Sequence, residues 1–176
     1  MAPSRRRATG VAALLTVAVC LLAAGSAFAA DQRVVTIRDD CDPVTFNAAG
    51  VPCIGDGRTP IGELVAAAQA NDPLPQWRFS RPDFNIDAGG TIHVVNEGGE
   101  AHTFTMVPQF GNGCIDVLNP KAKADQPPAV PCDTIVPILP GGTADVTVGS
   151  AGTVRFQCMI HPWMHSVVDV RDRGED

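Results

Sequence analysis

Residues 152–166 read GTVRFQCMIHPWMHS, and they place a cysteine, two histidines and two methionines within one short stretch. Cys158, His161 and Met164 follow the spacing C-x2-H-x2-M, directly after one run of alternating apolar residues and directly before another. A loop between two strands can point several side chains at one centre, whereas successive side chains of a straight strand diverge. The stretch therefore predicts a loop that holds a metal ion, rather than ordinary core and loop residues.

The donor set points to copper. A thiolate, an imidazole and a thioether are soft to intermediate ligands, and together they suit an ion that cycles between Cu(I) and Cu(II) better than magnesium or calcium. A trigonal site of this type needs one further histidine, and only His93 and His102 lie upstream. His102 begins a strand pattern after a glycine-rich turn, so it is the expected ligand. His93 lies in mid-strand, and we expect it to be structural or solvent-facing. Zinc is the alternative occupant.

Cysteine counting supports the same loop. Without Cys20, which lies in the leader described below, five cysteines remain. Four of them form two local pairs, and pairing neighbours closes the shortest loops of the three possible connectivities. The expected bridges are Cys41–Cys53 and Cys114–Cys132. Cys158 is left over, and a metal bond would protect its thiol from oxidation.

The first 29 residues predict a secretory signal peptide. Three arginines at positions 5–7 precede an apolar run from Val11 to Ala24, and small residues end the segment at Ala29. Twin-arginine export and a lipobox at Cys20 are the less favoured alternatives. Cleavage would leave 10 basic and 19 acidic residues, a net charge of −9. The pattern predicts a secreted or periplasmic protein without a transmembrane segment, and the acidic charge argues against nucleic acid and anionic membranes as partners.

The rest of the chain is dominated by strand patterns. Residues 30–75 are expected to form an N-terminal extension with a short helix at Ile61–Ala70, and residues 76–176 a single β-domain. The aperiodic segment from Pro108 to Pro137 is interpreted as an insertion loop closed by the second disulfide. Alternation predicts strands at Val34–Ile37, Trp77–Phe79, Phe84–Ile86, Thr91–Val95, His102–Val107, Ala144–Val148, Thr153–Cys158 and Ser166–Val170.

Residues 77–170 resemble a cupredoxin of the plastocyanin and amicyanin type. The matching features are Ile86-Asp87-Ala88-Gly89-Gly90, Val95-Asn96 before His102, Gly141-Gly142, and the stretch from Gly152 to Met164. The resemblance implies an all-β Greek-key sandwich that binds one copper ion per chain. It also implies that His102, Cys158 and His161 are the strong equatorial ligands and Met164 the weak axial one. Thr103 departs from the pattern, because many members place asparagine there to tie the ligand loops together; its hydroxyl offers a substitute.

Neighbouring residues have less specific roles. Met159 is expected in the core or at its rim, and Met106 in the core. His165 is expected to face solvent, with metal ligation as the alternative. Pro162 and Trp163 are interpreted as an apolar rim around an exposed edge of His161, where a redox partner would dock; packing of Trp163 under the loop is the equal alternative.

These patterns predict a monomeric electron carrier with a type 1 copper site. Copper storage, delivery or sensing is the alternative, which the extra methionines and His165 would favour. Enzymatic activity is not expected, because a copper reductase or oxidase would need further histidines and the chain has four.

Overall fold

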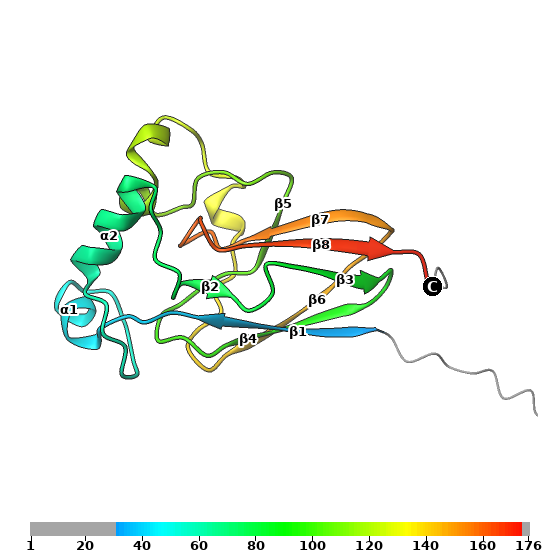
Figure 1. Cartoon of the computed structure of the whole chain (residues 1–176), viewed down its shortest axis with the longest axis horizontal. Helices are drawn as coiled ribbons and strands as arrows, with labels where there is room; N and C mark the ends of the chain where they lie inside the picture. The colour runs from blue at the N-terminus through cyan, green and yellow to red at the C-terminus, as the bar shows by residue number, and fades with distance from the viewer. Residues whose placement is uncertain (1–30, 174–176) are drawn as a thin grey trace, which may run out of the picture.

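The computed structural model describes residues 31–173, so the expected signal peptide at residues 1–29 lies outside the described residues. The described chain forms two four-stranded sheets packed around one apolar core (Figure 1). The strands are β1 (Gln32–Arg38), β2 (Arg78–Phe79), β3 (Asp83–Asp87), β4 (Thr91–Asn96), β5 (Thr105–Val107), β6 (Thr143–Thr147), β7 (Gly152–Gln157) and β8 (His165–Arg171).

The first sheet has the order β2-β1-β4-β6 and the second the order β3-β8-β7-β5. β1 pairs parallel with β4 and β3 pairs parallel with β8, whereas the other neighbours are antiparallel. Side-chain alternation explains the packing, because Ile92 and Val94 of β4 are fully buried while the residues between them are half-buried. The core is also aromatic, with Phe156 stacked on Phe104 at a centroid distance of 4.3 Å. The expected all-β sandwich is confirmed.

Strand β1 belongs to the first sheet, although residues 30–75 were expected to precede the β-domain. It lies between β2 and β4, and its register runs from Gln32 opposite Thr91 to Ile37 opposite Asn96. Val35 and Ile37 are fully buried in the core. The boundary expected at residue 76 therefore falls between two strands of one sheet.

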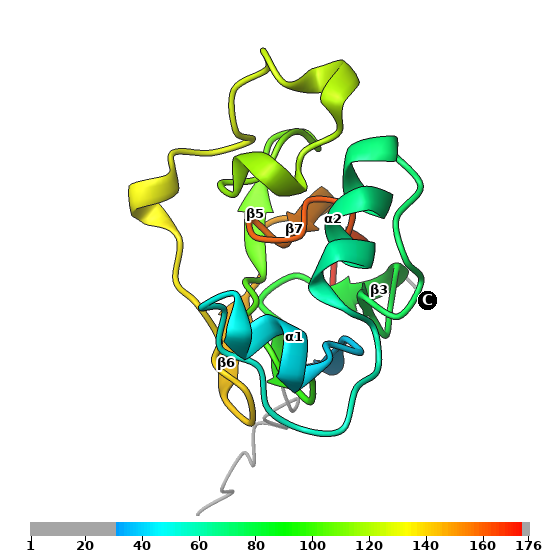
Figure 2. The same ribbon diagram turned by 90° about the vertical axis from the view of Figure 1, so that its left-hand side faces the viewer.

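Two helices follow β1 and lie at the end of the sandwich that carries the loop after β7 (Figure 2). Helix α2 (Ile61–Ala70) confirms the expected helix and buries Leu64 and Ala68. Helix α1 (Pro43–Ala48) was not expected. The sequence carries a signal for its N-terminus, because aspartate is a preferred N-cap residue and proline at position 43 suits the first helical position. In the structure, Asp42 accepts hydrogen bonds from the N–H groups of Val44 and Thr45.

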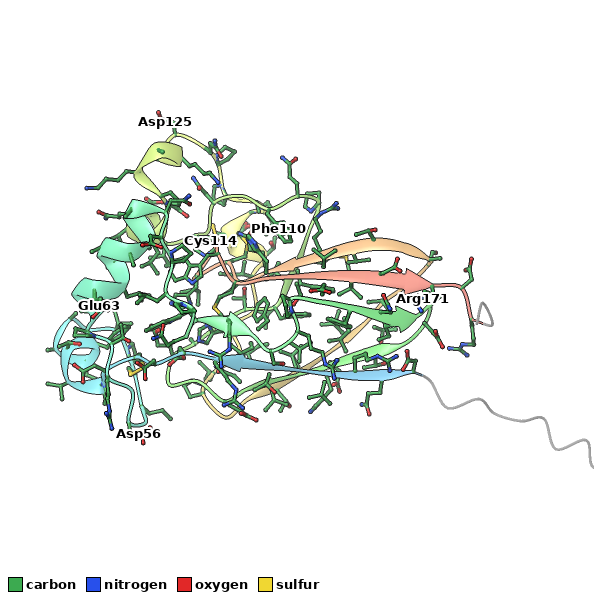
Figure 3. All side chains as sticks on the ribbon, in the orientation of Figure 1. Asp56, Glu63, Phe110, Cys114, Asp125 and Arg171 are labelled. Atoms are coloured by element: carbon green, nitrogen blue, oxygen red, sulfur yellow. A yellow bond between two sulfur atoms is a disulfide. The ribbon has the colours of Figure 1, made fainter. Side chains whose placement is uncertain are left out.

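The segment 108–137 forms a long loop with three short 3-10 helices, η1 (Asp116–Leu118), η2 (Lys121–Lys123) and η3 (Cys132–Thr134). The expected disulfides Cys114–Cys132 and Cys41–Cys53 are both present. Cys158 is free, as expected, and it is buried. In Figure 3, Asp125 marks the tip of this loop and Arg171 marks the opposite end of the sandwich.

Two local expectations were wrong. β5 begins at Thr105 rather than at His102, and Met106 is 49% exposed rather than part of the core. The second result follows from alternation, because burial of the adjacent Val107 turns Met106 to the outside of the sheet. No helix among residues 31–173 is long and apolar enough to cross a membrane.

Candidate metal centre

Two connecting segments that are distant in sequence bring the predicted ligands together. Cys158 and His161 lie in the short loop between β7 and β8, and His102 lies in the segment between β4 and β5. The Cys158 sulfur is 3.8 Å from Nδ1 of His102 and 3.8 Å from Nδ1 of His161. Within the described residues, His102, Cys158 and His161 form a fully buried group whose possible ligand atoms all lie within 4.8 Å of one another.

The spacing of these atoms fits a metal ion. When a thiolate sulfur lies about 2.3 Å and an imidazole nitrogen about 2.0 Å from one metal ion, at a trigonal angle, the two donor atoms are about 3.7 Å apart. Both histidines present Nδ1 to the sulfur, so each keeps Nε2 for a hydrogen bond on its outer side. The residues present therefore fit the copper ion that the family resemblance implies.

Met164 lies beside this group, and backbone hydrogen bonds hold it there. Its N–H donates to the carbonyl of His161 at 3.0 Å, and its carbonyl accepts from the N–H of Cys158 at 3.0 Å. The side chain is 1% exposed. These bonds close the loop and keep Met164 next to the other predicted ligands, and its role as the axial ligand stays a prediction.

The Cys158 sulfur has the surroundings of a thiolate. Burial would raise its pKa, but His102 and His161 outweigh burial and hold the pKa well below its ordinary value. The N–H groups of Thr103 and His161 also point at the sulfur, each at 3.4 Å. A thiolate is the form of cysteine that binds metal, so these surroundings favour the metal-binding form of Cys158.

Asp39, at the end of β1, fixes the outer side of His102. Its Oδ2 lies 2.8 Å from Nε2 of His102, and its side chain is 2% exposed. The same carboxylate accepts hydrogen bonds from the N–H groups of Cys41, Gly99 and Glu100 at 3.0 to 3.2 Å. Burial would raise the pKa of Asp39, but the bonds from His102, Gly99 and Glu100 lower it to about 2.

Asp39 and Cys158 together make the surroundings of His102 favourable to positive charge. Burial would lower the pKa of His102, but the hydrogen bonds and charges of these two partners raise it to about 9. A metal cation between the ligands satisfies the same preference for positive charge.

Glu100 lies on the outer side of His161. Its Oε2 accepts a hydrogen bond from Nε1 of Trp77 at 2.8 Å and lies 3.5 Å from Nε2 of His161, too far for a good hydrogen bond. Burial raises the pKa of Glu100, and the nearby His161 and Trp77 only partly offset this. His161 itself is fully buried, so the exposed imidazole edge expected from the sequence is wrong.

Thr103 connects the two ligand segments, as proposed for its hydroxyl. Its Oγ1 accepts a hydrogen bond from the N–H of Met159 at 2.8 Å, while its own N–H points at Cys158. Gly99 lets the loop at Ile54 pack against the segment that carries His102, because a Cβ at position 99 would lie 2.1 Å from the carbonyl oxygen of Ile54. The metal centre is therefore held by backbone and hydroxyl groups as well as by its ligands.

Sequence reasoning missed Asp39, Glu100 and Trp77. Asp39 is separated from His102 by 63 positions, so no local spacing could connect them. Glu100 offered a weak signal, because it lies two positions before His102. Trp77 was assigned to a strand, and its indole N–H gave no sign of a carboxylate partner.

The remaining histidines lie outside the cluster. His93 is half-buried in β4 and its Nδ1 lies 2.6 Å from Asp145, which agrees with a structural role. His165 was expected to face solvent, but it is half-buried and stacks on Phe110 at a centroid distance of 3.8 Å.

Met159 is fully buried, as expected for a core residue. Pro162 is buried, and the half-buried Trp163 packs against the core with its ring 5.5 Å from that of His161.

Two mixed four-stranded sheets, with a His-Cys-His cluster held between them at one end, define a cupredoxin-like fold. No family model matches the sequence, and no curated protein matches it.

Solved structures similar to this chain include a reduced Cu(I) form of an amicyanin variant at pH 4. It has 17% identity and a TM-score of 0.38, over 56% of this chain and 77% of that one. Another is a purple cupredoxin from Nitrosopumilus maritimus, with 14% identity and a TM-score of 0.43, over 79% of this chain and 99% of that one.

Proposed function

We propose that this protein is an extracytoplasmic type 1 copper protein that carries single electrons. The observation that carries the proposal is the buried group formed by His102, Cys158 and His161, whose donor atoms have the spacing of a trigonal copper site. The copper-containing amicyanin among the similar structures is consistent with it. A thiolate and two imidazoles suit both copper oxidation states, so the bound ion would supply one-electron redox chemistry.

The chain's own residues favour rapid electron exchange by keeping the ligands still. Asp39 fixes the ring of His102, Thr103 ties the two ligand segments together, and the N–H groups of Thr103 and His161 hold the sulfur. Each of these groups is buried, so exchange with water does not disturb them. Little rearrangement is then needed when the charge of the site changes.

Burial also favours electron transfer over copper delivery. Delivery requires a ligand of the acceptor to reach the ion, yet the His102, Cys158, His161 and Met164 side chains are at most 1% exposed. An electron does not need direct access, because it can pass through packed side chains. We propose no catalytic step, since only His93 and His165 remain as histidines and they lie apart from the cluster.

The test is the visible and EPR spectrum of the protein loaded with Cu(II). An intense thiolate-to-copper absorption is expected, together with reversible reduction at an electrode. Cys158→Ser should abolish the absorption, because the charge-transfer donor is lost. Met164→Leu is the matched control, since it should keep the absorption and shift the reduction potential. A band that survives Cys158→Ser would overturn the ligand assignment, and copper transfer to an acceptor without reversible reduction would favour delivery.

We also propose where a redox partner docks. Glu100, next to His161, lines a largely apolar hollow of about 380 Å³ together with Val51, Ile54, Leu139 and other residues. Ile54 and Leu139 are 62% and 64% exposed. This hollow is a better candidate than the rim expected at Pro162 and Trp163, because Pro162 is buried and Trp163 packs against the core.

The partner is expected to be basic around an apolar centre. Asp40, Asp56 and Glu97 line an adjoining hollow that shares Ile54 and Pro140 with the first one. Leu139→Asn should slow electron exchange with a basic haem protein, whereas Val136→Asn should not, because Val136 is also exposed but lies outside both hollows. The rate should fall as ionic strength rises. Equal rates for both variants would contradict this docking surface.

A further inference from the structure

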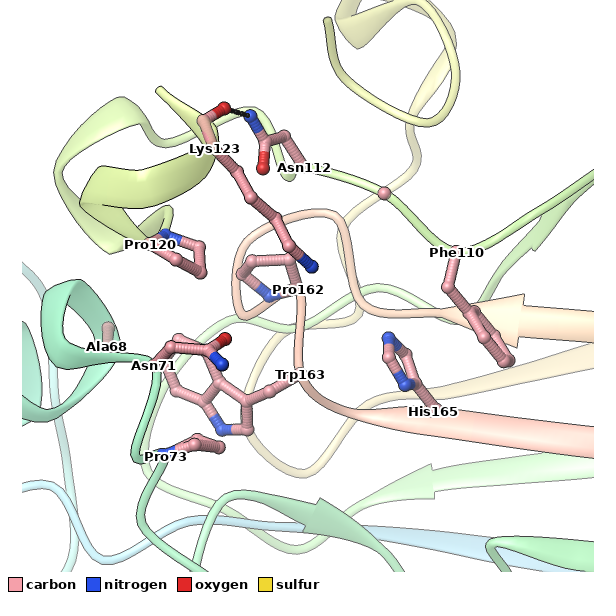
Figure 4. A pocket seen from close by; sticks show the side chains of 11 residues that line it. Ala68, Asn71, Pro73, Phe110, Asn112, Pro120, Lys123, Pro162, Trp163 and His165 are labelled. Carbon is pink, nitrogen blue, oxygen red and sulfur yellow. Dashed lines mark hydrogen bonds between the residues drawn. The ribbon is translucent and has the colours of Figure 1, made fainter. Parts of the chain in front are cut away.

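A second pocket lies on the other side of the metal-binding loop. It has a volume of about 130 Å³ and lies between helix α2, the segment 110–123 and the residues that surround Met164 (Figure 4). Its walls include the rings of Phe110, Pro120, Pro162 and Trp163. The pocket is therefore apolar over much of its surface, and it touches the loop that carries the ligands.

Polar atoms without partners line this apolar pocket. Among the residues described, buried side-chain atoms without a hydrogen-bond partner are Asn112 Oδ1, His161 Nε2, Trp163 Nε1 and His165 Nε2. Three of these four residues line this pocket, and His161 is the exception. A buried polar atom without a partner costs free energy, so this concentration indicates that something polar occupies the pocket.

Asn112 gives the clearest chemical requirement. It is 2% exposed, and its amide nitrogen donates to the carbonyls of Lys123 and Gln126 at 2.7 and 2.8 Å. These two acceptors fix the orientation of the amide, so the unpartnered atom is the oxygen. Figure 4 shows this oxygen turned to the inside of the pocket. Whatever binds there must therefore offer a hydrogen-bond donor.

Lys123 gives the second requirement. Its side chain extends past Pro162 toward His165 in Figure 4, and it has no carboxylate partner within residues 31–173. The ammonium of Lys123 therefore places one positive charge at the pocket. The ligand should therefore carry a negative charge.

We propose that this pocket binds a small organic anion that carries a hydroxyl group beside its carboxylate. The carboxylate would pair with Lys123, the hydroxyl would donate to Asn112 Oδ1, and the carbon atoms would contact Phe110 and Pro162. A volume of about 130 Å³ holds several water-sized groups, which suits a hydroxy acid of two or three carbons. A bare anion without a donor leaves the Asn112 oxygen unsatisfied.

Occupation of the pocket would act on the metal-binding loop. Pro162, Trp163 and His165 line the pocket, and they flank Met164 on both sides. A bound anion would thus hold the loop from outside, independently of the metal ligands within it. The proposal does not depend on copper, since every group it uses belongs to the protein.

The experiment is a titration of the 15N-labelled protein with glycolate, followed through the indole N–H signals. The chain has two tryptophans, which provide a reporter and an internal control. Trp163 lines the pocket, whereas the indole of Trp77 is bonded to Glu100 on the other side of the site. The Trp163 signal should shift with a dissociation constant of about 1 mM or lower, and the Trp77 signal should stay in place. Metal-free and Cu(I)-loaded samples are both titrated.

Two lysine variants test the charge. Lys123→Gln should weaken glycolate binding at least about tenfold, because it removes a charge-assisted hydrogen bond. Lys121→Gln is the matched control, since Lys121 lies in the same short helix but does not line the pocket. Asn112 is left intact, because its amide holds the surrounding loop together.

Two further probes test the hydroxyl and the charge separately. Acetate, which lacks the hydroxyl, and ethylene glycol, which lacks the charge, should each bind at least about tenfold more weakly than glycolate. A Trp163 shift in either the metal-free or the Cu(I)-loaded sample, with these preferences, supports the proposal. No shift in both samples means that the pocket holds water only, and equal effects of the two lysine variants mean nonspecific binding; either result overturns it.

Discussion

The two histidines predicted as ligands, His102 and His161, have ring centroids 4.8 Å apart, yet the surroundings of their outer sides differ. His102 meets Asp39 at 2.8 Å, and the pKa of that carboxyl is lowered to about 2. His161 meets Glu100 at 3.5 Å, and the pKa of that carboxyl is raised. Both carboxyl groups are nearly fully buried, so burial alone does not explain the difference.

The number of hydrogen-bond donors explains it. Asp39 accepts from three backbone N–H groups and from His102, whereas Glu100 accepts one good hydrogen bond, from Trp77. Several hydrogen-bond donors offset the free-energy cost of burying a charged carboxylate, whereas a single donor does not. His102 is therefore held by a charged carboxylate, whereas Glu100 lies near His161 without a good hydrogen bond to it.

The largest effect is expected from Asp39→Asn. Each donor around Asp39 points at an oxygen, so an asparagine would turn its own N–H₂ group toward two of them and leave them unsatisfied. We expect a loss of about 3 kcal/mol in the free energy of unfolding, measured by urea denaturation. Copper affinity should fall as well.

Asp145→Asn is the matched control for this variant. It alters another Asp–His pair, that of Asp145 with His93, whose side chains are 66% and 33% exposed. Surface pairs contribute at most about 1 kcal/mol, so a small loss is expected. Similar losses for the two variants would show that Asp39 is not an anchor.

Thr103→Val tests the connection between the two histidine segments. The substitution keeps the shape of the side chain but leaves the buried N–H of Met159 without its acceptor. We expect a loss of about 1 to 3 kcal/mol in the free energy of unfolding. Thr103→Ser retains the hydroxyl and should recover most of it. Equal losses for Val and Ser would indicate that the methyl group, not the hydrogen bond, matters.

Acid should remove the contribution of Asp39 in a defined pH range. The folded pKa of about 2 is below the ordinary value of 3.8, so the folded state binds fewer protons than the unfolded state. The stabilisation, about 2 kcal/mol, is present above the ordinary pKa and is lost as the pH falls toward 2. Urea denaturation from about pH 5 to about pH 2 should therefore show a shrinking difference between the wild type and Asp39→Asn. A difference that stays constant would contradict the assigned pKa.

The smallest effect is expected from Glu100→Gln. Glutamine can still accept the hydrogen bond from Trp77, and it removes a buried charge that the raised pKa shows to be unfavourable. The free energy of unfolding of the metal-free protein at neutral pH should stay equal or rise by at most about 1 kcal/mol. A large loss would place Glu100 in the same class as Asp39 and remove the contrast between the two histidines.

Much of this site was readable from local patterns. The C-x2-H-x2-M spacing lies within one loop, the odd cysteine count isolates Cys158, and the glycine-rich turn marks His102. These signals work because each depends on neighbours a few positions away, where strand alternation and loop length fix the geometry. The helix at 61–70 and both disulfides follow for the same reason, since their partners are close in sequence.

Local sequence patterns were enough to predict the donor atoms, the disulfides and the alternation that builds the sandwich. The charge and exposure of those donors depend instead on packing between distant segments. Asp39, Glu100 and Trp77 reach the ligands through contacts between distant segments, and the same packing buries His161. Burial and hydrogen bonding depend on which groups surround an atom in three dimensions, and the spacing of residues along the chain does not predict those groups.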